Sequence, residues 1–127
     1  MHTFKYQEKN SFERRLAEAN RIRERYENKI PVIIELSPGE KNIDPIDKNK
    51  FLVPSSMSLG DFMLVIRRRI KLTSESALYL FIVNEENPAG ILGSCGQIMD
   101  TLYDSYKSND NFLYITYNSE NTFGFSV

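Results

Sequence analysis

The feature of the sequence that most constrains the fold is the run Ala77–Val83, whose apolar side chains would fall on both faces of an extended chain. A strand of that kind is typical of the interior of a sheet. Three other segments have strand character, namely Ile30–Leu36, Lys50–Pro54 and Phe112–Tyr117. Pro31 cannot donate a backbone hydrogen bond, so it belongs at the start of its strand or on an edge. The sequence therefore predicts a sheet built from these four segments.

The first 29 residues are predicted to be helical. Ser11 is the expected N-cap, and a separate short helix is expected before it. Arg15 and Arg23 fall within the apolar stripe of the main helix, and we expect their stems to lie along apolar surface with the charges outward. The apolar residues of that stripe recur at helical spacing and are Phe12, Leu16, Ala19, Ile22 and Tyr26.

Two further helices are predicted downstream. Ser58 is expected to cap the first, and one face of this helix carries Leu59, Phe62, Met63, Ile66 and Ile70. The second covers Ile98–Tyr106. The stretch 84–97, which precedes the second helix, contains several glycines and a proline. That composition is typical of a mobile loop.

The order of these elements is two strands, a helix, a strand, a short helix and a last strand. Pattern alone makes the ubiquitin-like β-grasp one α+β option among several. Two additional N-terminal helices would precede it. We expect a helical arm over residues 1–29 packed on the body, a β-grasp body over residues 30–119, and a flexible C-terminal tail over residues 120–127.

Length, cysteine content and charge narrow the class of protein. A chain of 127 residues with 41% hydrophobic residues suits one folded domain. The sole cysteine, Cys95, excludes an internal disulfide and favours a reducing compartment. No stretch approaches the roughly 18 apolar residues that span a bilayer, so membrane attachment would be peripheral or covalent. Residues 1–29 have a net charge of +3 and the remainder −4, an asymmetry too weak to indicate nucleic acid.

The sequence gives little support to a thiol enzyme, a zinc site, a nucleotide site or a nucleic-acid interface. A catalytic thiolate at Cys95 would need a base, and the sole histidine is His2. One Cys and one His cannot build a structural zinc site. Gly90-Ile91-Leu92-Gly93 lacks the spacing of a phosphate-binding loop. We interpret Arg67-Arg68-Arg69 as a solvated helix face with one partner-binding arginine. We therefore expect no enzymatic activity, no cofactor and no nucleic-acid partner.

Seven segments in a fixed order along nearly the whole chain form a more specific signal. They are Phe12-Glu13-Arg14-Arg15, Lys29–Ile33, Ile46–Pro54, Gly60-Asp61-Phe62, Ile66–Ile70, Phe112–Tyr117 and Glu120–Gly124. Together they resemble the autophagy-related ubiquitin-like modifiers, the family of the GABA-receptor-associated protein and of microtubule-associated light chain 3. The resemblance implies the β-grasp fold.

The resemblance also implies attachment to a membrane lipid. A dedicated cysteine protease trims members of this family after a glycine. Ubiquitin-like activating and conjugating enzymes then join the glycine to phosphatidylethanolamine on the autophagosome membrane. Here the glycine would be Gly124, next to Phe123, and the discarded peptide Phe125-Ser126-Val127. The protein would be cytoplasmic, and on the autophagosome membrane once lipidated.

A second implication is a groove that binds autophagy receptors through an aromatic-x-x-aliphatic motif, which adds a strand to the sheet edge. Positions matching the aromatic pocket are Glu18, Ile22, Pro31, Lys50, Leu52 and Phe112. Positions matching the aliphatic pocket are Phe51, Val53, Pro54, Met57, Phe62, Val65 and Ile66. Lys48, Lys50 and Arg69 would meet acidic residues that flank the motif. Most of the apolar positions can instead belong to the core, and Lys50 can protect an edge strand.

The chain departs from the family in a few places. The segment between Val83 and Met99 is longer than usual, and so is the turn around Pro38-Gly39-Glu40. Asp61 replaces a common Gln, and Met57 replaces a common Leu. We expect neither insertion to touch the tail or the two pockets. The alternative function is a soluble adaptor that uses the same groove without being conjugated.

Overall fold

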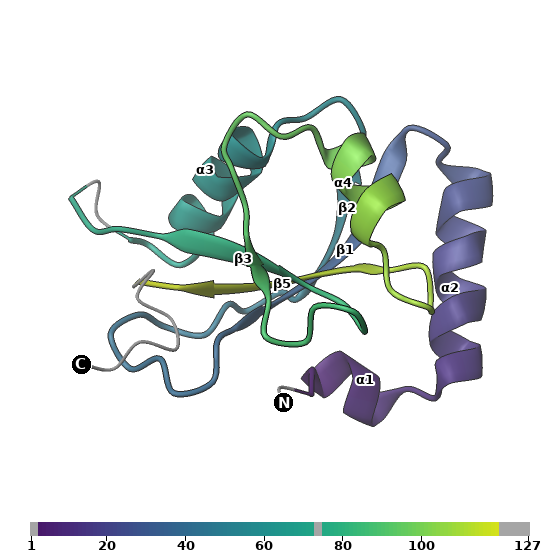
Figure 1. Cartoon of the computed structure of the whole chain (residues 1–127), viewed down its shortest axis with the longest axis horizontal. Coiled ribbons are helices and arrows are strands. Elements are labelled where there is room, and N and C mark those ends of the chain that lie inside the picture. Colours follow the sequence, from purple (N-terminus) through teal and green to yellow (C-terminus); the bar gives the residue numbers. More distant parts are fainter. Residues whose placement is uncertain (1–2, 73–74, 120–127) are drawn as a thin grey trace.

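The computed structural model describes residues 3–72 and 75–119, which fold into a sheet packed with helices (Figure 1). In chain order the elements are α1 (Lys5–Lys9), α2 (Phe12–Arg25), β1 (Lys29–Leu36), β2 (Lys50–Pro54), α3 (Leu59–Arg69), β3 (Tyr79–Val83), β4 (Ile91–Leu92), α4 (Met99–Tyr106) and β5 (Leu113–Asn118). Each helix and strand expected from the sequence is present. The strand ends differ from expectation by two residues at most, whereas α2 ends at Arg25, four residues before the expected end of the helical arm.

The strands form a mixed sheet in the order β2-β1-β5-β3-β4. β1 is antiparallel to β2 and parallel to β5, and β3 is antiparallel to both β5 and β4. Pro31 lies near the start of β1, before the pairing with β5 begins at Val32, so its missing N–H interrupts no bond to β5. The architecture is the α+β arrangement that the sequence predicts.

The stretch 84–97, expected to be a mobile loop, instead contains the short strand β4. β4 pairs with β3, which makes β3 an interior strand. The glycines here allow close packing. A Cβ added to Gly93 would lie 2.3 Å from Cδ2 of Leu59, and one added to Gly90 would lie 3.1 Å from Cβ of Phe81. Composition predicted a loop because it does not distinguish glycines that permit close contact from glycines that permit motion.

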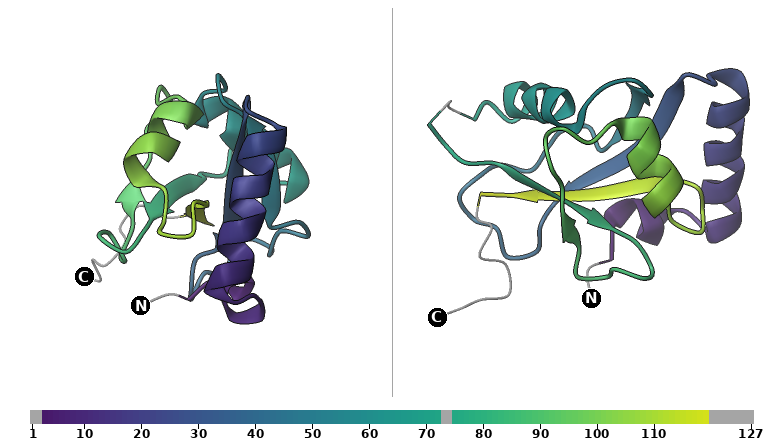
Figure 2. Two further views of the ribbon diagram at one scale, coloured as in Figure 1. Left: turned by 90° about the vertical axis from the view of Figure 1, so that its right-hand side faces the viewer. Right: turned by 45° about the horizontal axis from the view of Figure 1, so that its top comes forward.

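Side chains alternate along each strand and divide the interior into two clusters. The main core lies between the sheet and the helices α3 and α4, and its largest strand residues are Ile30, Ile34, Phe51, Leu80, Ile82, Leu113, Ile115 and Tyr117. The arm-side core lies under α1 and α2 and comprises Phe4, Tyr6, Ala19, Ile22, Ile33, Val83, Phe112 and Tyr114. The two views of Figure 2 show α1 and α2 packed apart from α3 and α4.

Serine side chains cap the two longer predicted helices. Oγ of Ser11 accepts a hydrogen bond from the backbone N–H of Arg14 at 3.2 Å, and Oγ of Ser58 accepts one from Asp61 at 3.1 Å. Both caps confirm the predicted helix starts. No helix within residues 3–72 and 75–119 has both the length and the apolar character needed to cross a bilayer.

Buried polar groups fasten the arm to the sheet. The carboxylate of Glu35 in β1 accepts hydrogen bonds from the N–H groups of Lys5 and Tyr6, at 2.9 and 3.2 Å, at the start of α1. Nε of Arg15 in α2 lies 2.8 Å from Oδ2 of Asp110, a residue that is 1% exposed. The expectation that the charge of Arg15 points outward is therefore wrong, because its partner lies 95 positions away in the sequence.

Asp110 is the centre of this network. Besides Arg15, its carboxylate accepts hydrogen bonds from the backbone N–H of Phe112 and from the hydroxyl of Tyr114. Burial and the contact with Asp110 raise the pKa of Tyr114, so its phenol stays protonated. Nη1 of Arg15 also donates to the carbonyls of Gln7 and Asn10 at 3.3 and 2.7 Å. One arginine thus connects α1, α2 and the turn before β5.

Candidate docking edge and chain exit

β2 forms one edge of the sheet, and within the described residues it pairs with β1 alone. Phe51 and Val53 point into the main core, while Leu52 is 38% exposed. The outer backbone groups of such an edge are available to an added strand. The predicted groove would use this edge.

The residues predicted for the aromatic pocket gather where α2 packs on β1, beside β2. Lys50 forms an ion pair with Glu18 of α2. Pro31 is the register partner of Leu52 across β1 and β2. The remaining two, Ile22 and Phe112, are buried in the arm-side core. The residues predicted for the aromatic pocket thus lie close to one another, and Leu52 is the most accessible apolar residue among them.

Lys50 is already engaged on this surface. Besides its ion pair with Glu18, its Nζ lies 5.7 Å from the centroid of the Tyr6 ring. The Lys50 and Glu18 side chains are 36% and 25% exposed, so water screens the pair only in part. An acidic residue of a bound peptide would therefore have to exchange with Glu18 to reach this ammonium group.

The residues predicted for the aliphatic pocket belong largely to the main core. Phe62 and Ile66 are 1% and 0% exposed, and Val53 is buried. Phe51 meets Phe62 edge-on, with ring centroids 5.7 Å apart. The half-buried members of the set are Pro54, Met57 and Val65. These positions could line a pocket or belong to the core, and for Phe62 and Ile66 the structure favours the core. A pocket here would be lined at its surface by the half-buried residues.

Two exposed cations flank the ring of Phe51. Nζ of Lys48 lies 4.9 Å and Cζ of Arg69 lies 5.6 Å from the ring centroid. Nε of Arg69 is also 3.2 Å from the carboxylate of Asp47. Positive charge beside an edge strand favours the approach of an acidic peptide more than it adds to affinity.

The end of β5 is held by the turn that follows β1. Oε1 of Glu40 accepts hydrogen bonds from the backbone N–H and the hydroxyl of Ser119, at 2.7 and 3.0 Å. The N–H of Ser37 donates to the carbonyl of Tyr117 at 2.9 Å. The turn at Pro38-Gly39-Glu40 thus contacts the residue directly before the predicted tail, and the expectation that it does not touch residues 120–127 stays a prediction. Sequence reasoning missed this contact because its partners are 79 positions apart.

The hydrogen bonds of Glu40 also set its protonation state. Burial alone would raise the pKa of this carboxyl, but hydrogen bonds from Ser119 and Asn42 outweigh burial and lower it. The Asn42 N–H lies 2.7 Å from Oε2, so both carboxylate oxygens are used. Glu40 is therefore ionised at neutral pH.

Three predictions remain, which concern the C-terminal glycine, the cysteine and metal binding. Gly124 and Phe123 lie outside the described residues. Cys95 is exposed, and its backbone carbonyl accepts a hydrogen bond from Gly60 at 3.0 Å. No three His, Cys, Asp or Glu side chains within the described residues are grouped so that they could hold a metal ion.

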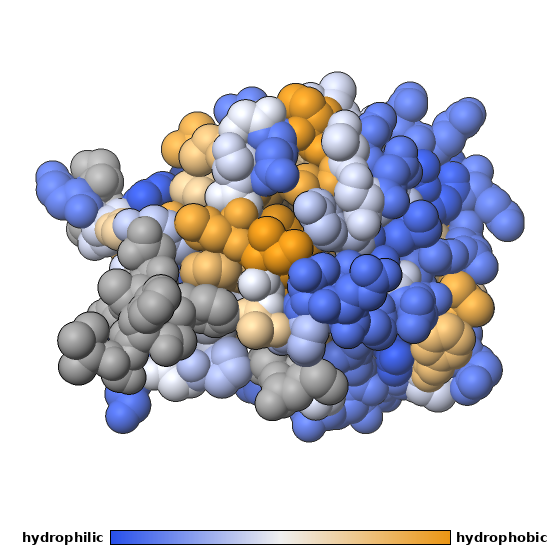
Figure 3. Space-filling view, viewed as in Figure 1, coloured by the Kyte–Doolittle hydropathy of each residue, from blue (hydrophilic) through white to orange (hydrophobic). Residues whose placement is uncertain are grey.

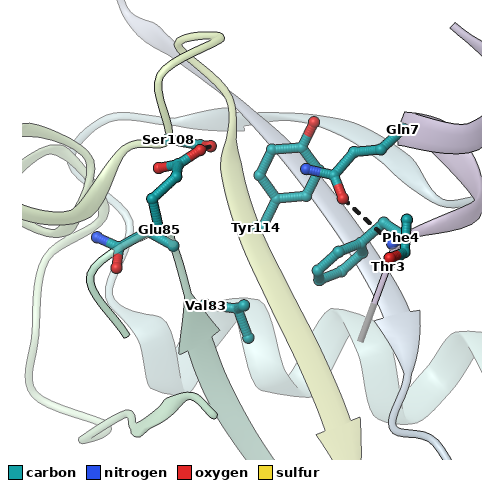
Figure 4. Close-up of a pocket in the computed structure, with 8 residues that line it drawn as sticks. Thr3, Phe4, Gln7, Val83, Glu85, Ser108 and Tyr114 are labelled. Carbon is teal, nitrogen blue, oxygen red and sulfur yellow. Dashed lines mark hydrogen bonds between the residues drawn. The ribbon is translucent and has the colours of Figure 1, made fainter. Parts of the chain in front are cut away.

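A cavity of about 200 Å³ lies on the arm side, away from the docking edge (Figure 4). Its lining comprises Thr3, Phe4, Gln7, Val83, Asn84, Glu85, Ser108 and Tyr114. Polar groups of its rim pair with one another. The N–H of Phe4 donates to Oε1 of Gln7 at 3.2 Å, and the hydroxyl of Ser108 donates to Glu85. No residue of the predicted site lines this cavity.

The opposite edge of the sheet also exposes apolar surface. Leu92 of β4 is 48% exposed. Figure 3 shows apolar atoms gathered over β3 and near α4, whereas the outward side of α2 is mainly hydrophilic. This surface provides a natural reference for tests of the β2 edge.

Comparison with known proteins adds independent information. Residues 14–124 match the family described as "Autophagy protein Atg8 ubiquitin like". Autophagy-related protein 8e of Arabidopsis thaliana is 50% identical over 118 residues, covering 92% of this chain and 90% of that protein. Autophagy-related protein 8 of Schizosaccharomyces pombe is 49% identical over 114 residues, covering 90% and 88%. The crystal structure of Trypanosoma brucei ATG8 superposes with a TM-score of 0.82 at 35% identity, covering 97% of this chain and all of that one.

Proposed function

Because the chain belongs to the Atg8 family of autophagy-related ubiquitin-like proteins, we propose that it is a lipid-conjugated modifier. A cysteine protease trims it after Gly124, and Gly124 is then joined to phosphatidylethanolamine on autophagosomal membranes. The observation that carries this proposal is the extent of the family match, which ends at Gly124 and leaves Phe125-Ser126-Val127 beyond it. Removal of these residues accounts for that boundary.

The proposed chemistry uses the carboxylate that trimming creates. The activating enzyme joins it to the AMP part of ATP and releases pyrophosphate, and an enzyme thiol then displaces AMP to form a thioester. On the conjugating enzyme, the lipid amine attacks the thioester carbonyl, forms an amide and releases the enzyme thiol. Glycine suits each step because the absence of a Cβ lets catalytic groups approach closely. Phosphatidylethanolamine contributes two acyl chains, and a single chain gives only marginal anchoring. In this scheme the enzymes supply the catalytic groups and the chain is their substrate.

The second part of the proposal is recruitment of receptors at the β2 edge. A peptide with an aromatic-x-x-aliphatic motif pairs with β2 and places its aromatic residue against Leu52 and Pro31. Its aliphatic residue lies against Met57 and Val65. The unpaired outer edge of β2 in the described chain, the exposure of Leu52 and the cations beside Phe51 support this placement. Micromolar affinity, about −8 kcal/mol, is expected for such a short motif.

The intact mass of the cellular protein tests the conjugation. We expect loss of the residues after Gly124 together with the mass of the lipid during starvation. A Gly124→Ala variant should remain untrimmed and unlipidated, while its circular dichroism spectrum matches that of the wild type. Persistence of the full 127-residue mass during starvation would rule out conjugation and favour the unconjugated adaptor.

Titration with a labelled peptide tests the docking edge. The peptide carries an aromatic-x-x-aliphatic motif preceded by acidic residues. Leu52→Ala should weaken its binding about tenfold, as expected for an anchor residue in a small interface. Leu92→Ala is the matched control, since it truncates an exposed leucine on the opposite edge. Equal losses in both variants would contradict docking at β2.

A further inference from the structure

We propose that Glu40 is a positioning residue for C-terminal trimming. By holding Ser119, it fixes the position of the residue that directly precedes the substrate segment. This inference rests on the proposed trimming after Gly124 and adds a determinant that lies far from the cleaved bond in the sequence.

The turn that carries Glu40 is built to present its carboxylate. The N–H of Glu40 donates to the carbonyl of Ser37 at 3.2 Å, which closes a turn with Pro38 and Gly39 at its centre. Gly39 has φ +82°, as required at the third position of a type II turn, where glycine is favoured. The Glu40 backbone is therefore set by the local sequence before any contact with β5 forms.

The turn holds the end of β5 at successive residues. The N–H of Ser37 donates to Tyr117, one step beyond the last β1–β5 pair. Nδ2 of Asn118 lies 3.3 Å from Oγ of Ser37. Oε1 of Glu40 then receives both the N–H and the hydroxyl of Ser119. A charged acceptor forms stronger hydrogen bonds than a neutral one, so the last of these contacts is the firmest.

The position of Ser119 matters because only a short stretch of chain separates it from Gly124. Gly124 lies five positions beyond Ser119, which gives a reach of roughly 17 Å at full extension. When Ser119 is held, fewer chain conformations have to be lost as the protease binds the segment. The effect falls on substrate binding, because Glu40 does not touch the bond that is cleaved. Loss of the contact should therefore raise KM and leave kcat nearly unchanged.

Kinetics of trimming with full-length chains test this inference. The enzyme is the cysteine protease that trims members of this family, and Autophagy-related protein 8 of Schizosaccharomyces pombe serves as the positive control. Glu40→Ala should raise KM about three- to tenfold, the range expected for the loss of one hydrogen bond of ordinary net strength. Glu40→Gln keeps an oxygen that accepts the Ser119 N–H and should restore most of the wild-type KM. Glu86→Ala, at an exposed acidic residue in the stretch 84–97, should behave like the wild type.

Amide hydrogen exchange at Ser119 gives a readout of the contact itself, and we expect faster exchange in Glu40→Ala than in Glu40→Gln. An unchanged KM in Glu40→Ala, with the wild type trimmed at Gly124, overturns the positioning role and leaves the proposed function intact. Equal losses in Glu40→Ala and Glu40→Gln, with a lowered Tm, indicate general loss of structure and also overturn it. If the wild-type chain is not cut after Gly124 while the control protein is, the proposed function and this inference both fail.

Discussion

The two sides of the sheet bury similar apolar residues but differ in what accompanies them. The main core is closed by apolar side chains and by tyrosines whose hydroxyls reach its rim, as Tyr117 does when it donates to the carbonyl of Asp44 at 2.8 Å. The arm-side core also buries the Arg15–Asp110 pair and the Glu35 carboxylate. Apolar burial has no preferred direction, whereas charged hydrogen bonds do. The arm-side polar groups therefore fix where α1 and α2 lie.

One strand serves both sides because its side chains alternate. Ile30, Val32 and Ile34 of β1 face the main core, while Ile33 faces the arm side and Glu35 reaches the start of α1. A shift of one residue in register would exchange the two sets. It would also place Glu35 in the main core without its partners, so this residue protects the register as well as capping the helix.

The largest expected effect follows from Phe62→Ala in the main core. The side chain is 1% exposed and packs on Phe51, so its removal should lower the free energy of unfolding by about 3–5 kcal/mol. Chemical denaturation measures this loss, with Phe62→Leu as a milder control. If Phe62→Ala left stability unchanged but abolished peptide binding, Phe62 would belong to the groove and not to the core.

The next effect should come from Asp110→Asn on the arm side. The amide is neutral and cannot match the charge of Arg15, which stays largely buried at 14% side-chain exposure. Breaking a buried pair of this kind costs about 3 kcal/mol. Hydrogen exchange should become faster in α1 and α2 before it does in β1, with Asp104→Asn on the exposed face of α4 as control. Uniform faster exchange across the sheet would contradict a specific role in holding the arm.

Most of the fold could be predicted because it depends on local patterns. The short apolar runs of β1, β3 and β5, and the serine caps of α2 and α3, are all visible in short windows of sequence. β4 could not be predicted, since two residues between glycines carry no periodic signal. Family resemblance, and not pattern, selected the β-grasp among the α+β options.

The candidate site was predicted less completely. Family resemblance identified the neighbours along β2, but it could not separate Phe62 and Ile66, which are fully buried, from Leu52, which is exposed. Helical spacing did place Phe62 and Ile66 on the apolar face of α3, but it does not show how far a pocket could reach between α3 and β2. The contacts Arg15–Asp110 and Glu40–Ser119 join residues far apart in sequence, and single charged residues give no sign of a distant partner.

A smaller effect is expected for Glu35→Gln. Gln can accept only through one oxygen, so it satisfies one of the two N–H groups of Lys5 and Tyr6 that the carboxylate now accepts. Loss of a helix cap costs about 1 kcal/mol. Exchange should become faster in α1 but not in α2, which distinguishes this change from Asp110→Asn. Glu27→Gln, at an exposed site after α2, is the matched control and should leave α1 unchanged.

The last effect is confined to alkaline solution and compares one tyrosine from each side. Burial, with the charges of Glu18 and Asp110, raises the pKa of Tyr6 to about 12, and burial likewise raises that of Tyr117 to about 12. A pKa raised by folding above the ordinary value of 10.0 contributes stability that is fully present below pH 10. That contribution is lost as the pH rises through about 12, because the unfolded chain releases its proton first.

Phenylalanine variants distinguish the contributions of Tyr6 and Tyr117 to stability in this alkaline range. Tyr6→Phe keeps the edge-on contact with Phe112, at 5.2 Å between centroids, but has no proton to lose. Its stability should fall less steeply between pH 10 and 12 than that of the wild type, and the difference should appear in the exchange of α1. The stability of Tyr117→Phe should likewise fall less steeply between pH 10 and 12 than that of the wild type. In this variant the difference should appear in hydrogen exchange across the sheet. Lysines also titrate here, but they are common to all three proteins and cancel in the comparison. Identical slopes in Tyr6→Phe and the wild type would show that the arm remains closed when Tyr6 ionises, so that its polar contacts with Glu35 and Asp110 alone determine its position.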